Sequence, residues 1–341
     1  MSLSDRLIFA LTNLLVYVRY PLLCLRYRVR QGRWADIARP GRYSELIQWR
    51  KVFDRNPLFP VFADKLAAKE WVAARWPDLR TPEVVWIGER YQDVPADYLS
   101  PDFAIKLNNG SSTNFFPHRQ GTSRADFNSV ARSWFAAPIL QWLRRVSRQE
   151  WAYAPVRPKV FVERRIVDEP LVDINIRVSN GKATMASCAT GFKTGNDRLG
   201  FFWPDGQPAA GAGSSRWVAL DSTFRVPSRY REAIEIAERI SEGIDYLRVD
   251  FLSAGDRLFV GEITVYPASG FVTDGASTEV SYRYWLESIH LAWPLSTARP
   301  WWTSLYLNAF RRWIASREQE LGSAGAFLSQ LRRTESGESA R

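Results

Sequence analysis

Two neighbouring apolar segments carry charged side chains at spacings that could bind a metal ion. Arg248 and Asp250 lie two residues apart in YLRVDFL, and Glu262 lies in RLFVGEITVY. Alternation along a strand places Arg248 and Asp250 on one face, and an antiparallel hairpin could bring Asp250 opposite Glu262. Two facing carboxylates repel unless a cation joins them, and a divalent ion with triphosphate oxygens would do so. The residues leave open the alternative of two rim carboxylates neutralised by Arg248.

Two lysines could bind an anionic group. Lys65 follows Asp64 at the start of a predicted helix, and Lys106 ends the apolar segment DFAIKL, just before the small-residue turn NNGSSTN. Backbone amides of such a turn can approach phosphate oxygens, and an ammonium group adds a point charge. Taken alone, this signal is weak, and a surface lysine before an ordinary turn is the interpretation that the segment favours.

Glu163 is a third candidate, because it follows an apolar run in KVFVERRIV. A carboxylate at the end of a strand can accept a hydrogen bond from a ribose hydroxyl or from an amine. The alternative, which the segment alone favours, is a salt bridge between Glu163 and either Arg164 or Arg165.

Composition narrows the class of protein. The chain has 341 residues, of which 46% are apolar and 24% charged, which argues against wholesale disorder. Two cysteines and two histidines exclude a disulfide scaffold and a Cys- or His-rich metal site, so any metal must be held by oxygen ligands, which suits Mg²⁺. The low cysteine content fits a reducing, cytoplasmic compartment. The net charge of +10 indicates an anionic partner, with nucleotide phosphate or a membrane surface ranked ahead of nucleic acid.

Two apolar regions could contact a membrane at the inner face of the cell. LIFALTNLLVYV, at residues 7–18, is too short to span a bilayer, but it precedes several arginines that could face lipid head groups. Residues 281–316 are rich in tryptophan and arginine. For both regions, the interpretation we favour is helices packed against the core of the protein.

The elements that must position these residues can be read from periodicity. Strands are predicted over 81–88, 102–107, 158–167 and 171–190, the last with a turn at Asn180-Gly181, and helices over 61–75 and 229–243. Residues 191–215 contain six glycines and are predicted to form a mobile loop, a candidate lid. The predicted divisions are an N-terminal helical segment 1–60, a lobe 61–157, a second lobe 158–280, an aromatic helical cap 281–332 and a disordered tail 333–341.

Taken in order, the motifs DK, K-x-x-x-G-S-S, VER, RVD and GEIT resemble those of the ATP-grasp superfamily. The nearer match is to the TupA-like ATP-grasp proteins of bacterial polysaccharide clusters, over roughly residues 43–271. The resemblance implies an α+β ATP-grasp fold that holds a nucleotide between two α+β lobes, here with extra N- and C-terminal helices.

The resemblance also implies roles for individual residues. Lys65 and Lys106 would hold ATP phosphates, Lys106 and Arg248 would be catalytic, and Arg248 would contact the transferred phosphoryl group. By the same resemblance, the loop over the phosphates would consist of Gly110, Ser111 and Ser112. The hinge that binds adenine would include Glu163, Arg164 and Ile166, and Asp173 would be a weaker contact to the ribose. The Mg²⁺ ligands would be Asp250, Glu262 and Thr264.

The activity implied is an ADP-forming ligase that joins a carboxylate to an amine through an acyl phosphate, in the synthesis of cell-surface polysaccharide or glycopeptide. Its substrates would be small or glycan-linked acids and amines. The chain departs from the family pattern at Asn175, where a lysine is usual, at Ser112, where a second glycine is usual, and at Thr264, where many ATP-grasp proteins have asparagine. The departures at Asn175 and Ser112 motivate one alternative, a non-catalytic nucleotide-binding scaffold. A membrane-peripheral glycosyltransferase is another, although no Asp-x-Asp motif supports it.

Overall fold

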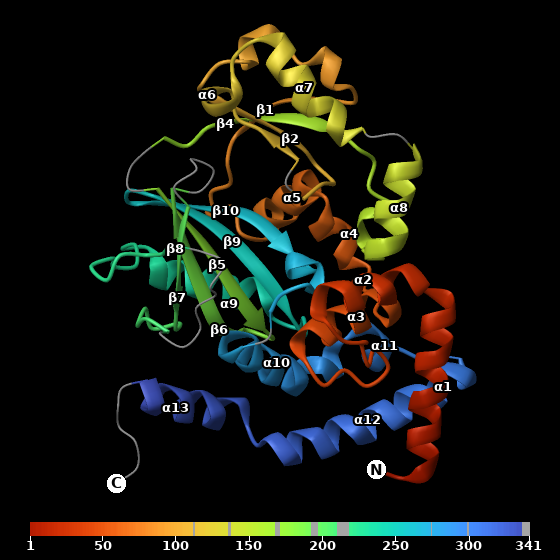
Figure 1. Cartoon of the computed structure of the whole chain (residues 1–341). Helices are drawn as coiled ribbons and strands as arrows, with labels where there is room; N and C mark the ends of the chain where they lie inside the picture. Colours follow the sequence, from red (N-terminus) through yellow and green to blue (C-terminus); the bar gives the residue numbers. More distant parts are fainter. Residues whose placement is uncertain are drawn as a thin grey trace.

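The computed structural model describes residues 1–111, 113–135, 138–167, 171–191, 197–209, 218–273, 275–298 and 300–335. The predictions for Ser112, for part of the 191–215 segment and for the end of the tail therefore lie outside the described residues. Helices and two β-sheets are combined in one chain, as the predicted α+β class requires (Figure 1).

The smaller sheet has four strands in the order β1-β4-β2-β3, and the larger has six in the order β10-β9-β5-β6-β7-β8. In the described part of the chain, neighbouring strands pair antiparallel, except that β7 and β8 are parallel. The strands are β1 (Val84–Gly88), β2 (Phe103–Leu107), β3 (Asn114–Phe115), β4 (Val160–Arg164), β5 (Leu171–Ser179), β6 (Lys182–Thr190), β7 (Arg198–Phe202), β8 (Val218–Ala219), β9 (Leu247–Ala254) and β10 (Arg257–Thr264).

Helices pack around both sheets and form the two ends of the chain. They are α1 (Leu3–Arg19), α2 (Pro21–Gln31), α3 (Tyr43–Phe53), α4 (Leu58–Ala63), α5 (Lys65–Arg75), α6 (Pro117–Gln120), α7 (Arg124–Trp134), α8 (Pro138–Arg148), α9 (Tyr230–Ser241), α10 (Ala276–Ser288), α11 (Trp293–Ser296), α12 (Trp301–Leu321) and α13 (Ala324–Glu335). Figure 1 shows the smaller sheet above the larger one, with α5 at their junction.

The predicted strands and the turn at Asn180-Gly181 are confirmed, but two other predictions are wrong. The single helix expected over 61–75 is two helices, because Asp64 is extended (φ −92°, ψ 110°) and its side chain accepts hydrogen bonds from the backbone N–H groups of Leu66 and Ala67. This N-cap makes Lys65 the first residue of α5. The expected loop 191–215 contains a strand, β7, which pairs with β6 and buries Phe202.

Alternation in β5 separates the core from the site. Val172, Ile174 and Ile176 are buried in the main hydrophobic core, to which α9 contributes the predicted stripe of Ala233, Ile236, Ala237 and Ile240. Since successive side chains of a strand point to opposite faces, Asp173 and Asn175 face away from this core.

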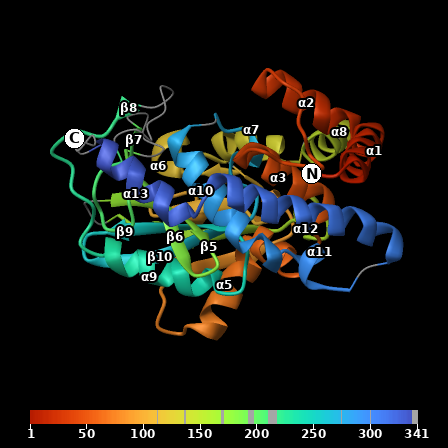
Figure 2. The same cartoon turned by 90° about the horizontal axis from the view of Figure 1, so that it is seen from below.

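The aromatic C-terminal region is a helical cap on the core, as favoured from the sequence. Trp285 is fully buried and stacks on Tyr246, with ring centroids 4.5 Å apart. Phe310 of α12 stacks on Trp49 of α3 at 5.0 Å. Figure 1 shows α12 and α13 running along the lower side of the molecule, and α1, α2 and α8 lie together at one edge in both views (Figures 1 and 2).

No single helix in the described ranges has the length and apolar character needed to cross a membrane. α1 and α2 meet these requirements only as a pair, and the pair is bent by 101°.

A buried charged network joins α3 to the ends of the β9–β10 hairpin. Arg50 is fully buried; its Nη2 donates to Asp245 Oδ1 at 2.7 Å, and its Nη1 donates to the carbonyl oxygens of Tyr246 (2.9 Å) and Val265 (3.1 Å). Asp54 lies next to it, with Oδ2 3.9 Å from Arg50 Nε. The guanidinium therefore fixes the backbone just before β9 and just after β10.

The pKa of Asp54 predicts how stability depends on pH. Burial, together with the negative charge of Asp245, raises the pKa of Asp54 from 3.8 to about 7, although Arg50 opposes this. The folded state therefore keeps a proton that the unfolded chain releases. This contribution to stability is complete below about pH 4 and is lost as the pH rises through about 7.

Urea unfolding of the wild type and of Asp54→Asn should show this dependence. Relative to the variant, whose side chain cannot ionise, the wild type should lose free energy of unfolding between about pH 4 and about pH 7. A difference that stays constant over this interval would mean that Asp54 is already ionised in the folded protein.

Candidate functional site

A cavity of about 590 Å³ lies between the two sheets, beside α5. Its lining comes from elements far apart in the sequence: α5, the smaller sheet and its following segment, and the face of β5, β9 and β10 that points away from the core. The lining residues are Lys65, Lys69, Pro82, Lys106, Ser111, Asn114, Phe116, Arg119, Gln120, Glu163, Asp173, Asn175, Arg248, Asp250, Phe251, Leu252, Gly261 and Glu262.

The β9–β10 hairpin brings the two predicted carboxylates together. Asp250 is the register partner of Glu262, which confirms the expected placement. The register shifts between Val260 and Glu262, so Gly261 is an extra residue that turns Glu262 onto the face of Asp250. A Cβ at Gly261 would lie 3.2 Å from the carbonyl oxygen of Asp250, which is tighter than most such contacts.

Arg248 neutralises Asp250 in this structure. Its Nε donates to Asp250 Oδ1 at 2.7 Å, its Nη2 donates to Oδ2 at 2.5 Å, and Nη2 also donates to Thr264 Oγ1 at 3.2 Å. Burial nevertheless raises the pKa of Asp250 to about 6; Arg248 opposes this rise, whereas the charges of Glu262 and Asp173 add to it. Both sequence interpretations therefore describe part of the site: the carboxylates face each other, and Arg248 pairs with one of them.

Lys65 approaches the second carboxylate from the start of α5. Its Nζ lies 3.8 Å from Glu262 Oε1 and donates to the carbonyl oxygen of Gly110 at 2.5 Å. The backbone N–H of Lys65 also donates to the carbonyl oxygen of Asn108, at 3.0 Å. These bonds hold the lysine against the turn that was predicted to bind phosphate.

Glu163 is buried between two lysines. Lys69 Nζ lies 2.9 Å from Oε1, and Lys106 forms an ion pair with Oε2. Burial alone would raise the pKa of Glu163, but Lys106 and Lys69 hold it below its ordinary value.

The sequence favoured a salt bridge between Glu163 and either Arg164 or Arg165. This prediction is wrong, because the side chains of both arginines lie outside the cavity. Arg164 Nε pairs with Glu83 at the surface, at 2.9 Å. Arg165 Nε donates to the carbonyl oxygen of Pro101, at 2.7 Å.

The structure brings together most, but not all, of the predicted site residues. Ser111 and Asp173 line the cavity, and Gly110 contributes its carbonyl oxygen to Lys65. Among the residues described, the cavity lining does not include Arg164, Ile166 or Thr264. The hydroxyl of Thr264 instead receives a hydrogen bond from Arg248. Ser112 lies outside the described residues.

Sequence reasoning missed several lining residues. Lys69 follows Lys65 by four positions, so both project from the same face of α5; this spacing was visible in the sequence. Arg119 and Gln120 of α6 gave no comparable signal, because only the fold brings α6 to the cavity. Asn175, a departure from the family pattern, lies opposite Asp250 in the sheet, and its amide can donate to Asp250 Oδ1 at 2.9 Å.

The donor set fits Mg²⁺ only together with ligands from a nucleotide. In the described part of the chain no group of three His, Cys, Asp or Glu side chains is arranged to hold a metal ion. Asp250 and Glu262 supply two carboxylates. Mg²⁺ commonly binds through one or two carboxylates with substrate phosphates and water completing its shell, so the residues present are sufficient for that mode.

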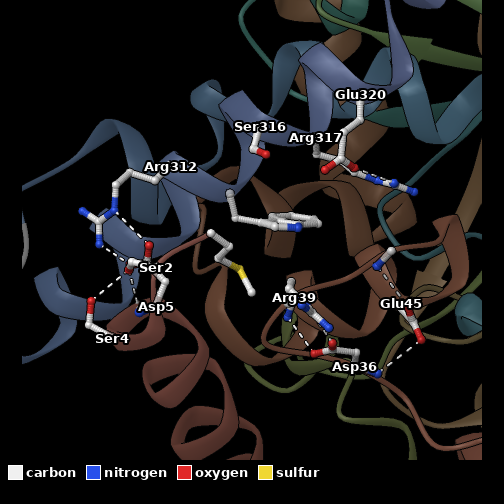
Figure 3. A pocket seen from close by; sticks show the side chains of 13 residues that line it. Ser2, Ser4, Asp5, Asp36, Arg39, Glu45, Arg312, Ser316, Arg317 and Glu320 are labelled. Carbon is white, nitrogen blue, oxygen red and sulfur yellow. Dashed lines mark hydrogen bonds and ion pairs between the residues drawn. The ribbon is translucent and has the colours of Figure 1, made fainter.

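A second cavity, of about 920 Å³, lies between the N-terminus of α1, the segment before α3, and α12 (Figure 3). Its charged side chains largely pair with one another: Arg312 with Asp5, Arg39 with Asp36 at 3.1 Å, and Arg317 with Glu320 at 3.2 Å. None of the predicted site residues lines it. We therefore place the candidate site in the cavity between the sheets.

Comparison with known proteins matches the chain to one family. The family model described as TupA-like ATP-grasp matches residues 45–283. No curated protein matches the chain.

Similar solved structures include three D-alanine–D-alanine ligases. That of Bacillus anthracis in complex with ATP is 13% identical with a TM-score of 0.37, over 74% of this chain and 68% of that one. That of Helicobacter pylori is 12% identical with a TM-score of 0.38, over 72% and 68%. That of Coxiella burnetii is 15% identical with a TM-score of 0.36, over 82% and 67%.

Proposed function

The chain belongs to the TupA-like ATP-grasp family, and from this premise we propose that it is an ATP-dependent, Mg²⁺-requiring ligase that joins a carboxylate to an amine. The reaction proposed passes through an acyl phosphate and serves the synthesis of cell-surface polysaccharide or glycopeptide. Its substrates are small or glycan-linked acids and amines.

One observation carries this proposal: each of the three cations assigned to phosphate pairs with a carboxylate assigned to the nucleotide or the metal. Lys65 lies beside Glu262, Lys106 beside Glu163 and Arg248 beside Asp250. Each of these positive charges therefore lies next to a carboxylate that we assign to binding of the nucleotide or of the metal. Phosphoryl transfer depends mainly on positioning and charge neutralisation, which these side chains can supply.

The proposed reaction has two steps. A carboxylate oxygen of the acid substrate attacks the terminal phosphorus of ATP, and ADP leaves. The amine then attacks the carbonyl carbon of the acyl phosphate; inorganic phosphate leaves, and the amine nitrogen loses a proton. Arg248 and Lys106 stabilise the charge on the transferred phosphoryl group, and Lys65 holds the phosphates against the turn at Gly110. Bound at Asp250 and Glu262, Mg²⁺ would neutralise charge on the phosphate oxygens.

Binding of Mg-ATP is the first test. Mg-ATP should raise the melting temperature of the wild type, and Asp250→Asn combined with Glu262→Gln should remove this increase, because it removes both carboxylates assigned to the metal. The matched control is Asp97→Asn with Glu89→Gln, which makes the same change of charge at exposed positions outside the cavity. No stabilisation of the wild type, or equal stabilisation of the site variant, would refute the proposal.

Turnover is the second test. ADP release should increase when pools of carboxylic acids and amines are added together with Mg-ATP. Nucleotide binding without any response to acids and amines would instead favour a non-catalytic scaffold. Stabilisation by a nucleotide sugar rather than by ATP would favour a glycosyltransferase.

A further inference from the structure

One edge of the molecule exposes apolar side chains that the core does not use. On α1, the exposed residues Leu3, Leu7, Leu11, Leu14, Leu15 and Val18 are each 58–75% accessible. Their spacing places them on one face of the helix, whereas Phe9 and Val16 are buried on the opposite face. From the sequence we favoured a helix packed against the core, and this is correct only for the inner face of α1.

Apolar side chains are also exposed on α2 and α8, which lie at the same edge of the molecule as α1 in both views (Figures 1 and 2). Leu22, Leu25 and Val29 are exposed on α2, and Trp142 and Leu143 on α8. Between these two helices lies an open groove of about 530 Å³, lined by Leu22, Leu25, Val29, Leu143, Arg26, Arg30, Arg144 and Ser147. Arg26 Nη1 joins the helices by donating to Ser147 Oγ at 3.1 Å.

Six arginines lie on the two helices that border this groove, and three of them, Arg26, Arg30 and Arg144, line it. The set is Arg26, Arg28 and Arg30 of α2 with Arg144, Arg145 and Arg148 of α8. Within the described ranges, none of the six comes within 4.0 Å of a carboxylate oxygen. Burial, and then the positive charges of Arg148 and Arg30, lower the pKa of Arg26, while the negative charge of Glu150 opposes this. By contrast, all three arginines that line the second cavity form ion pairs.

We propose that α1, α2 and α8 form a surface that binds an anionic phospholipid bilayer. Exposed leucines, valines and a tryptophan would enter the boundary between head groups and acyl chains, and the six arginines would meet the lipid phosphates. Monomeric proteins seldom leave a continuous apolar strip of this kind exposed to water. The combination of apolar side chains with unpaired arginines is complementary to a layer that presents both phosphate and hydrocarbon.

A second copy of the chain fits this surface less well. Pairing two copies through the same face would set six unpaired arginines of one copy near six of the other, because a two-fold interface uses identical patches. Like charges placed across an interface are repulsive. The charge of the patch thus favours an anionic surface over self-association.

The test is flotation of the full chain with vesicles. The wild type should float with vesicles of phosphatidylglycerol and phosphatidylcholine, and much less with vesicles of phosphatidylcholine alone; added salt should weaken the binding. Arg30→Glu with Arg144→Glu should lower the partition coefficient about 25-fold or more, at roughly fivefold per lost arginine contact. Arg132→Glu with Arg225→Glu changes the charge equally at exposed sites outside this surface and should bind like the wild type.

The apolar contribution needs its own pair of variants. Leu7→Gln with Leu11→Gln should lower binding at least about tenfold, because two leucines no longer enter the bilayer. Ile87→Gln with Val218→Gln, at exposed apolar positions elsewhere, should not. Melting curves without nucleotide check that every variant folds, so the result is independent of the proposed ligase activity.

Three outcomes would overturn the proposal. They are a wild type that does not float, a double arginine variant that floats as well as the wild type, and a dimer in solution that the leucine variant dissociates. The proposal would also be overturned if an acidic peptide bound the arginines while the wild type did not float with anionic vesicles.

Discussion

Replacing Arg248 with methionine should lower the rate of ADP formation about a hundredfold or more, a loss typical of removing one group that stabilises transition-state charge. Methionine keeps much of the side-chain volume and removes the positive charge. Lys65 and Lys106 remain in the cavity, so the dissociation constant for Mg-ATP should change much less than the rate. The rate is measured with the pool of acids and amines that gives the fastest release of ADP by the wild type.

Arg164→Met is the matched control for this prediction. The resemblance to the family assigns Arg164 to the nucleotide hinge, but its side chain is exposed and pairs with Glu83. We expect wild-type rates from this variant. Arg248→Lys should recover part of the activity, because it restores the charge without the two-pronged contact of a guanidinium. If Arg248→Met weakens Mg-ATP binding as much as it slows the reaction, Arg248 binds the ground state and has no special role in phosphoryl transfer.

Much of the site could be predicted because it depends on local patterns. Alternation in YLRVDFL and the turn that follows place Asp250 opposite Glu262, and a strand that ends in Lys106 before small residues is visible in the sequence. The sequence placed Lys65 at the start of a helix, but the separate helix that ends at Ala63 was missed, because the apolar periodicity continues across Asp64. Capping by the Asp64 side chain, rather than hydrophobic spacing, decides where α5 begins.

The partners of the charged residues could not be predicted in the same way. Glu163 precedes two arginines in the sequence, yet the strand directs its side chain into the cavity, where Lys69 and Lys106 lie. Both lysines come from other elements, so their approach depends on how the smaller sheet packs beside α5. The exposed face of α1 is a similar case: its inner and outer faces are both apolar, and only the packed structure shows which is buried.

Replacing Arg50 with methionine should cost about 3–5 kcal/mol of free energy of unfolding, because it leaves Asp245 and Asp54 buried without their cation. Arg50 is fully buried and binds Asp245 at 2.7 Å. The comparison is Arg231→Met, which breaks an exposed ion pair with Glu235 and should cost at most about 1 kcal/mol. Urea unfolding followed by circular dichroism measures both.

Neutralising the two aspartates separates charge from packing. If unpaired charge causes the loss, adding Asp245→Asn and Asp54→Asn to Arg50→Met should recover a large part of the stability, since a neutral site no longer holds isolated carboxylates. If the triple variant is no more stable than Arg50→Met, the lost hydrogen bonds to Tyr246 and Val265 dominate instead. Those bonds flank the hairpin that carries Arg248 and Asp250. In that case Mg-ATP should also raise the melting temperature of the triple variant by less than that of the wild type. The reason is that Arg50 no longer holds the backbone at Tyr246 and Val265, on either side of the hairpin that sets Asp250 opposite Glu262.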